Sequence, residues 1–137
     1  MAKSKIQSRS PSSGKRLQVQ ADTAGSPQYQ PPLFSLRYLR RDFSLSDCTQ
    51  EEKAAFADTL HKLSQMTWAE INTAPRHGSG HEIISRGAIK SSVPGHITED
   101  VNLLAFRFHG KVPMVGYRDG AIFYVVWIDP HFKLYDH

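Results

Sequence analysis

The sequence predicts a single small α+β domain, in which an N-terminal strand and two consecutive helices pack on a mainly antiparallel sheet. Two apolar, aromatic-rich runs at 113–119 and 122–128 are joined at an Asp-Gly pair, which is a strong short-range signal for a β-hairpin. Two helix-start patterns, at Thr49 and Thr67, precede these strands. Helices and strands that are segregated along the chain are typical of an α+β domain.

The 137 residues are enough for one domain, and the composition divides them into a tail (1–32) and a domain (33–137). The tail is rich in Ser, Gln, Pro, Lys and Arg, so it cannot bury enough apolar surface to offset its ordering entropy, and we expect it to be disordered. The tail has five basic side chains and one acidic side chain, Asp22, whereas the domain has twelve basic and twelve acidic side chains. A solvating role and a weak electrostatic attachment to RNA are both open for this basic tail.

The composition also disfavours several classes of protein. The sequence has no run of 18 apolar residues that could span a membrane, and its basic N-terminus lacks the apolar core of a secretory signal. Cys48 is the only cysteine, which excludes an internal disulfide and a thiolate zinc site and fits a reducing compartment. We therefore expect a cytoplasmic protein with no membrane partner. Because the domain is neutral, any contact that it makes with nucleic acid must be local.

Local sequence patterns predict the two helices and the first strand. Residues 33–39 alternate imperfectly between apolar and polar, which indicates a strand, although a short helix is also compatible. Thr49 and Thr67 are each followed by Glu three residues later, which is the spacing of a capping box. Helices are therefore expected from about 50 to 65 and directly after Thr67, and Pro75 ends the second.

The later strands are defined by which residues share a face. Residues 81–84 are compatible with a strand, and the rest of 81–100 is broken by Gly and Pro and is expected to be mostly loop. In the strand that follows, Leu104, Phe106 and Phe108 point to one side of the sheet. The run 122–128 is apolar on both faces, which predicts an interior strand that is covered on both sides.

The residues most suited to chemistry follow this last strand. His131 can act as a general acid or base near neutral pH, and Tyr135 can donate a proton or stack on a base. Arg107 and Arg118, on or near adjacent strands, can stabilise the charge of a phosphate. RNA cleavage by its own 2′-hydroxyl needs these functions and no metal or cofactor. A purely structural role, in which His131 and Tyr135 fasten the last strand, stays open.

Two histidines in the loop region are the residues nearest to a metal-site pattern. His77 and His81 have a spacing that could bind a metal on a helix, but Gly78 and Gly80 lie between them and favour a loop. No glutamate follows His77 as a zincin motif would require. We therefore expect no metal site.

The order of elements and the closing segment Val125-Val-Trp-Ile-Asp-Pro-His-Phe-Lys-Leu-Tyr-Asp resemble the RelE/HigB/ParE-like toxin superfamily, nearest to its HigB-type branch. The resemblance covers about residues 33–137. It implies a RelE-like fold and a growth-inhibiting toxin of a type II toxin–antitoxin pair. Most such toxins are metal-independent endoribonucleases (mRNA interferases), and their partners are a cognate antitoxin, mRNA and, in many members, the ribosome.

For individual residues, the resemblance implies that His131 is the base or acid and that Tyr135 is the acid or a stacking platform. Arg107 and Arg118 become phosphate ligands by position. Other functions stay open: a gyrase-directed toxin, as in the ParE-like branch, or a non-enzymatic module that binds a protein, including a catalytically silent relative. Aromatic residues such as Tyr117 motivate the binding module. The sequence therefore does not decide whether the protein is an enzyme.

Overall fold

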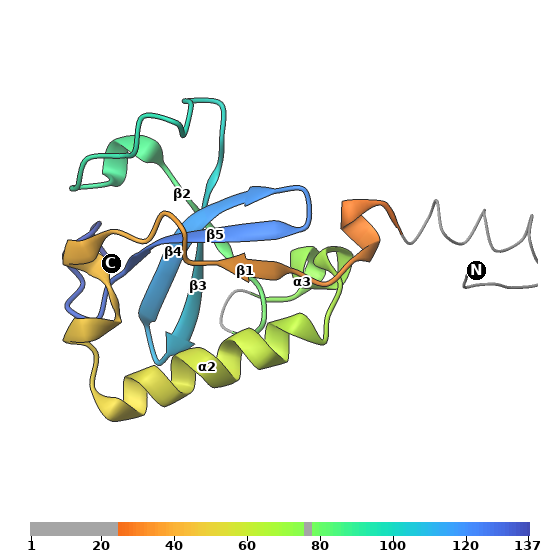
Figure 1. Ribbon diagram of the computed structural model, residues 1–137, viewed down its shortest axis with the longest axis horizontal. Coiled ribbons are helices and arrows are strands. Elements are labelled where there is room, and N and C mark those ends of the chain that lie inside the picture. The colour runs from red at the N-terminus through yellow and green to blue at the C-terminus, as the bar shows by residue number, and fades with distance from the viewer. Residues whose placement is uncertain (1–24, 76–77) are drawn as a thin grey trace, which may run out of the picture.

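A computed structural model describes residues 25–75 and 78–137, and in it a five-stranded sheet forms the centre of the fold (Figure 1). The strands are β1 (Leu33–Ser35), β2 (Glu82–Ile84), β3 (Leu103–His109), β4 (Val112–Asp119) and β5 (Ile122–Ile128). They lie in the order β1-β5-β4-β3-β2, with β1 parallel to β5 and every other pair antiparallel. The α+β class and the mainly antiparallel sheet are confirmed. Of the tail (1–32) that we expect to be disordered, residues 1–24 fall outside the described part of the chain.

The two helices begin where their capping boxes predict. α2 (Gln50–Ser64) starts after Thr49, whose Oγ1 accepts a hydrogen bond of 3.1 Å from the backbone N–H three residues on. α3 (Trp68–Thr73) starts after Thr67 in the same way, at 3.2 Å. In both boxes the glutamate accepts from the backbone N–H of the threonine in return, so two otherwise unpaired donors are satisfied. Single 3₁₀ turns complete the fold at η1 (Pro27–Tyr29), η2 (Arg41–Phe43), η3 (Leu45–Asp47) and η4 (Arg86–Ala88).

The sheet is covered on both faces. α2 and α3 pack on one face, where Phe56, Trp68 and Ile71 meet Phe106 and Phe123 from the strands. The opposite face is covered by loops and by the residues after β5, and its core contains Ile97, Leu103, Val115, Trp127, Leu134 and Tyr135. In Figure 1, α2 runs below the sheet and the segment that follows β2 loops above it. The interior position predicted for β5 is confirmed.

Both hairpins of the sheet use a two-residue loop with glycine first. His109 pairs with Val112, and Asp119 pairs with Ile122. The loops are therefore 110–111 and 120–121, and their first residues, Gly110 and Gly120, have φ of 59° and 62°. Glycine supplies this conformation without steric cost. The predicted hairpin is confirmed, and Asp119 is the last strand residue rather than part of the loop.

A β-bulge lies at the centre of the β4–β5 pair. Val115 pairs with Trp127 and Gly116 with Val125, which leaves Val126 as the extra residue. Val126 and Trp127 consequently both face the loop-covered side of the sheet. A Cβ atom on Gly116 would overlap the backbone carbonyl of Tyr124, so the two strands approach too closely for any other residue.

The segment before β1 already belongs to the packed structure. The backbone N–H of Trp68 donates to the carbonyl of Gln30 at 3.0 Å, and its indole N–H donates to the carbonyl of Ala121 at 3.0 Å. Gln28 accepts a hydrogen bond from Arg118 at 3.3 Å. The described fold thus starts upstream of Leu33, where the domain was expected to begin. Among the described residues, none of the helices has the length and apolar character needed to cross a bilayer.

Candidate active site

The buried carboxylate of Asp129 organises the residues that follow β5. This side chain is only 1% exposed. Its two oxygens accept hydrogen bonds of 2.9 Å from the backbone N–H groups of Lys133 and Leu134. The intervening Phe132 has a φ of 56°, which is unusual for a residue other than glycine, and this conformation reverses the chain direction. Asp129 thus fixes the segment that carries the candidate residues.

That segment brings Tyr135 and His137 together beside Asp129. Tyr135 is 7% exposed and belongs to the core on the loop-covered face. The imidazole of His137 stacks on its ring, with Nε2 3.7 Å from Asp129 Oδ2. Phe132 contacts the imidazole edge-on, with 4.7 Å between ring centroids. The His137 side chain remains 20% exposed, so this ring is held in one place and still reaches solvent.

The electrostatic surroundings of Tyr135 keep its phenol protonated. Burial raises the pKa of Tyr135 to about 12, and the negative charges of Glu82 and Asp129 add to this effect. Arg107, on β3, acts in the opposite direction and lowers the pKa. At neutral pH the phenol is therefore a proton donor and not a base. We call Arg107, Asp129, Tyr135 and His137 the Asp129 cluster.

The four residues selected from the sequence do not form a single site. Arg107 lies near enough to Tyr135 for its charge to lower the pKa of the phenol. His131 is exposed and lines a small hollow together with Asp42 and Asp129, but it makes no contact with Tyr135 or His137. Arg118 pairs with Phe123 at the far end of the β4–β5 hairpin, six residues of strand from Asp129. At about 3.4 Å per residue, that separation is roughly 20 Å, too far for Arg118 to share one phosphate with Tyr135.

His137 occupies the place that the sequence had suggested for His131. Both histidines follow the last strand, and residue type gave no reason to prefer either. The choice depends on the turn at Phe132, after which the chain returns to Asp129 and His137 Nε2 lies 3.7 Å from Asp129 Oδ2. No sequence pattern marks a phenylalanine with positive φ, so this residue was missed for a structural reason.

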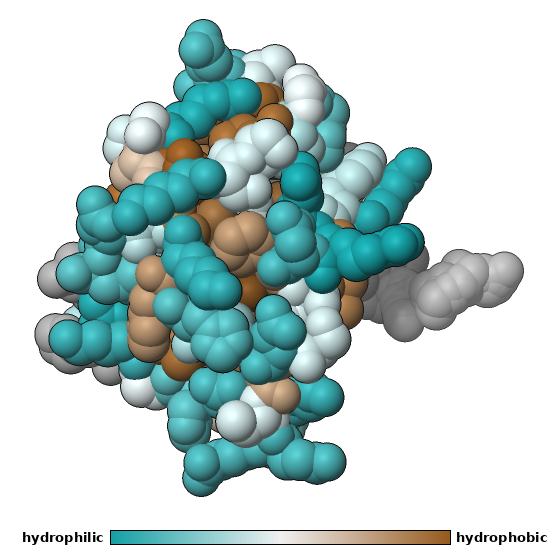
Figure 2. All heavy atoms as spheres, turned by 90° about the vertical axis from the view of Figure 1, so that its left-hand side faces the viewer, coloured by the Kyte–Doolittle hydropathy of each residue, from teal (hydrophilic) through white to brown (hydrophobic). Residues whose placement is uncertain are grey.

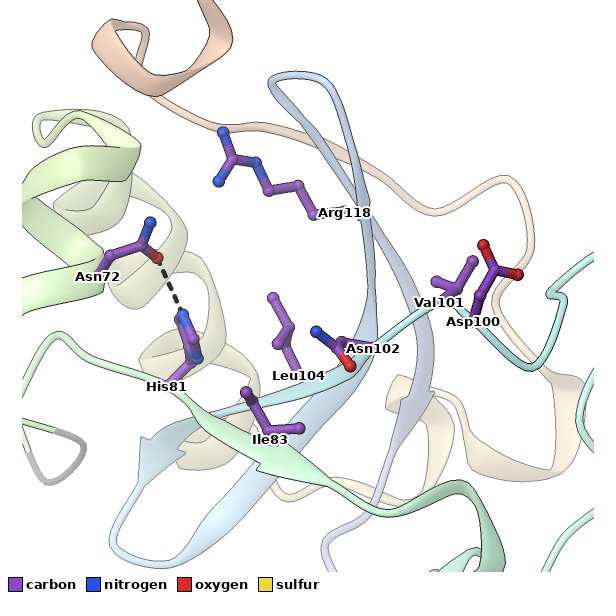
Figure 3. Close-up of a pocket in the computed structure, with 8 residues that line it drawn as sticks. All are labelled: Asn72, His81, Ile83, Asp100, Val101, Asn102, Leu104 and Arg118. Carbon is purple, nitrogen blue, oxygen red and sulfur yellow. Dashed lines mark hydrogen bonds between the residues drawn. The ribbon is translucent and has the colours of Figure 1, made fainter.

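Arg118 lies in a second polar region, at the tip of the β4–β5 hairpin. Its guanidinium carbon is 4.3 Å from the centre of the Trp68 ring, and its Nε donates to the carbonyl of Gly120 at 2.7 Å. Burial lowers the pKa of Arg118. Arg118 and His81 line the same hollow (Figure 3), and His81 Nε2 is 3.0 Å from Asn72 Oδ1. Burial, and then the charge of Arg118, lower the pKa of His81 and favour its neutral form.

The surface near the C-terminus is mainly polar. Figure 2 shows this end of the molecule, where apolar side chains appear as small areas between hydrophilic ones. His77, considered above as a partner of His81 in a metal site, lies outside the described residues. Within 25–75 and 78–137, no three His, Cys, Asp or Glu side chains are grouped so that they could hold a metal ion.

No protein-family model, no curated protein and no solved structure matches the chain. The choice between the Asp129 cluster and the Arg118 region therefore depends on their geometry. In the Arg118 region His96 is hydrogen-bonded to the Tyr117 hydroxyl, whereas in the Asp129 cluster a histidine lies beside both a carboxylate and a protonated phenol.

Proposed function

We propose that this protein is a metal-independent endoribonuclease that cleaves single-stranded mRNA with the Asp129 cluster. The observation that supports this proposal best is the position of the His137 imidazole between the Asp129 carboxylate and the Tyr135 ring. A histidine whose one nitrogen faces a buried carboxylate, while the ring stays accessible, is a suitable general base. Such a site needs a substrate that carries both its own nucleophile and a leaving group, and RNA provides both.

In the proposed reaction, His137 Nδ1 removes the proton of a 2′-hydroxyl. This nitrogen has no hydrogen bond to any described residue, and Nε2 faces Asp129, which stabilises the imidazolium that forms. The 2′-oxygen then bonds to the adjacent phosphorus, and the bond from phosphorus to the 5′-oxygen breaks. The products are a 2′,3′-cyclic phosphate and a 5′-hydroxyl end.

The other two side chains act on the charge that this reaction moves. The guanidinium of Arg107 neutralises charge on the phosphorane. The phenol of Tyr135 protonates the departing 5′-oxygen. A pKa of about 12 makes this phenol a weak acid, but an alkoxide leaving group is more basic than a phenolate, so the transfer is favourable.

The biological role that we propose is the toxin of a type II toxin–antitoxin pair. This part of the proposal is supported by the RelE-like order of elements and by the resemblance of residues 125–136 to the HigB-type branch. The partners would then be a cognate antitoxin and mRNA, including mRNA on the ribosome. The neutral charge of the domain fits a short contact with a single strand better than a wide contact with duplex.

The test is cleavage of a labelled single-stranded RNA by the purified protein in the presence of EDTA. We expect 2′,3′-cyclic phosphate ends, and no cleavage of the same oligonucleotide with 2′-O-methyl groups. His137→Gln should lower the rate by a factor of about 10²–10⁴, the usual contribution of a general base. His131→Gln is the matched control, because His131 is exposed and outside the cluster. Full activity of His137→Gln would refute the site.

Growth after induced expression in bacteria tests the toxin role separately. The wild-type protein should arrest growth with loss of mRNA, and His137→Gln should not. DNA damage signalling without loss of mRNA would instead identify a gyrase-directed toxin. RNA that stays intact in both experiments would leave the non-enzymatic binding module as the explanation.

A further inference from the structure

We infer that the tip of the β4–β5 hairpin is a second binding site, which takes one nucleotide of the RNA strand with Arg118 between its phosphate and its base. This inference rests on the proposed function, because it names how the same substrate is held away from the reacting bond. Two hollows of the surface meet here, and Arg118 and Val101 line both of them. They measure about 390 and about 350 Å³, which is within the range of small-molecule sites.

The first hollow has the chemistry of a phosphate site. Arg118 is held by the Trp68 ring, Gly120 and Gln28, and its Nη1 makes no hydrogen bond to any described residue. Asn72 and Asn102 add amide groups from opposite sides, as Figure 3 shows. A fixed guanidinium with neighbouring amide donors is a typical arrangement for a phosphate oxygen.

The other charged groups of this hollow do not neutralise the positive charge of Arg118. His81 is biased toward its neutral form, as described above, and a bound phosphate would favour its protonation. The acid of this hollow, Asp100, accepts a hydrogen bond from the Thr98 hydroxyl. In Figure 3 it lies beyond Val101, on the side away from His81. No ion pair between Asp100 and Arg118 is formed.

The second hollow is lined by a closed group of four aromatic rings. Tyr117 and Tyr124 are stacked, with 5.1 Å between centroids, and Tyr124 is 5.4 Å from Tyr38. Tyr38 is 4.2 Å from His96, whose Nε2 is 2.8 Å from the Tyr117 hydroxyl. Tyr38 and Tyr124 are half-buried and His96 is exposed, so the group still presents ring surface. Stacking of a base on such a surface contributes about 1–3 kcal/mol.

Two charged residues at the rim favour a nucleotide over an apolar ligand. The guanidinium carbon of Arg37 lies 5.2 Å from the centre of the Tyr38 ring. Arg37 thus adds a second cation close to where the sugar-phosphate backbone of the bound RNA would run. Asp119 lines the same hollow and is exposed. Its carboxylate can accept hydrogen bonds from the exocyclic amino group of a base, which favours guanine, adenine and cytosine over uracil.

One extended RNA strand can contact both the hairpin-tip site and the Asp129 cluster. Tyr124 is five residues from Asp129 along β5, a separation of about 17 Å at roughly 3.4 Å per residue. A short run of nucleotides can therefore contact the tyrosines at one end of the hairpin and the Asp129 cluster at the other. This arrangement would select single-stranded RNA, whose bases are free to stack.

Binding of oligonucleotides that cannot be cleaved tests the inference without a catalytic step. The probes are fluorescein-labelled 2′-O-methyl oligonucleotides in which all positions are abasic except one, and the full chain is titrated by anisotropy. One base should tighten binding about 5–150-fold over the fully abasic probe. Guanine should bind more tightly than uracil, and Asp119→Asn should remove this preference.

The contribution of Arg118 to binding is measured by how the affinity for the oligonucleotide depends on salt concentration. Arg118→Gln should reduce the slope of log affinity against log salt by about 0.7, the value for one phosphate contact on a single strand. Arg41→Gln, at an exposed arginine outside both hollows, should leave the slope unchanged. Equal binding of abasic and base-containing probes, or an unchanged slope in Arg118→Gln, would overturn the inference. Base-dependent binding by a protein that leaves RNA intact would support this site and reject the proposed nuclease.

Discussion

The imidazole of His137 lies nearly parallel to the phenol ring of Tyr135, with 4.2 Å between the ring centroids and 24° between the planes. Tyr135 is anchored in the core, whereas His137 is held by this stack, by Phe132 and by Asp129. The proposed base is thus positioned by the side chain that we propose as the acid. The ring and the hydroxyl of Tyr135 therefore have separable roles.

Tyr135→Phe keeps the stacked ring and removes only the proton donor. We expect kcat for RNA cleavage to fall about 10²-fold or more, with KM nearly unchanged, because the acid acts in the transition state. Tyr135→Leu removes the stack as well and should lower activity further. Single-turnover cleavage of the labelled RNA measures both variants. Wild-type kcat in Tyr135→Phe would show that the phenol is not the acid.

Tyr135 should also make stability depend on alkaline pH. Burial raises its folded pKa to about 12 from an ordinary value of 10.0. Between these values the unfolded chain has released the proton while the folded protein still holds it. The free energy of unfolding therefore decreases as pH rises through this window, by at most about 3 kcal/mol. Denaturant unfolding at pH 9 to 12 should show a shallower decrease in Tyr135→Phe than in the wild type.

Asp129→Asn tests the carboxylate that fixes the segment after β5. An amide has one acceptor oxygen in place of two, so one of the N–H groups of Lys133 and Leu134 loses its partner. We expect a loss of about 1–3 kcal/mol in stability, together with a lower cleavage rate. Asp136→Asn is the control, because Asp136 is exposed and its ion pair with Lys90 lies on the surface. Equal thermal stability of the two variants would contradict the role of Asp129.

Gly116→Ala tests the close approach of β4 and β5. The added methyl group meets the carbonyl of Tyr124, which is backbone and cannot rotate away. We expect destabilisation of about 1–3 kcal/mol or more, measured by denaturant unfolding. Gly95→Ala is the control for Gly116→Ala, because a Cβ atom at position 95 meets no atom within 4 Å. A native-like midpoint for Gly116→Ala would show that the bulge is placed incorrectly.

The local features of the fold were predictable from the sequence. Thr49 and Thr67 mark the helix starts, and Gly120 marks the hairpin, because each pattern satisfies backbone requirements within a few residues. The parallel pairing of β1 with β5 was not specified, because it joins segments about 90 residues apart and depends on tertiary packing. The bulge at Val126 likewise depends on contacts with the opposite strand.

The candidate site was predictable only in part. Tyr135 and Arg107 were identified by residue type and by their positions after and on the strands. Arg118 was placed with them because its strand is adjacent, but the register puts it at the other end of the hairpin. The choice between His131 and His137 depends on a single backbone conformation at Phe132.

The short strand β1 has a consequence for handling the protein. Its three residues occupy the outer side of β5, a longer and largely buried strand. If residues 25–35 were removed or detached, β5 would expose unpaired backbone groups along an apolar edge, which is a template for pairing with a second chain. Truncation of the N-terminal segment through β1 should therefore cause the protein to aggregate in a concentration-dependent way. This segment should be kept when the protein is expressed.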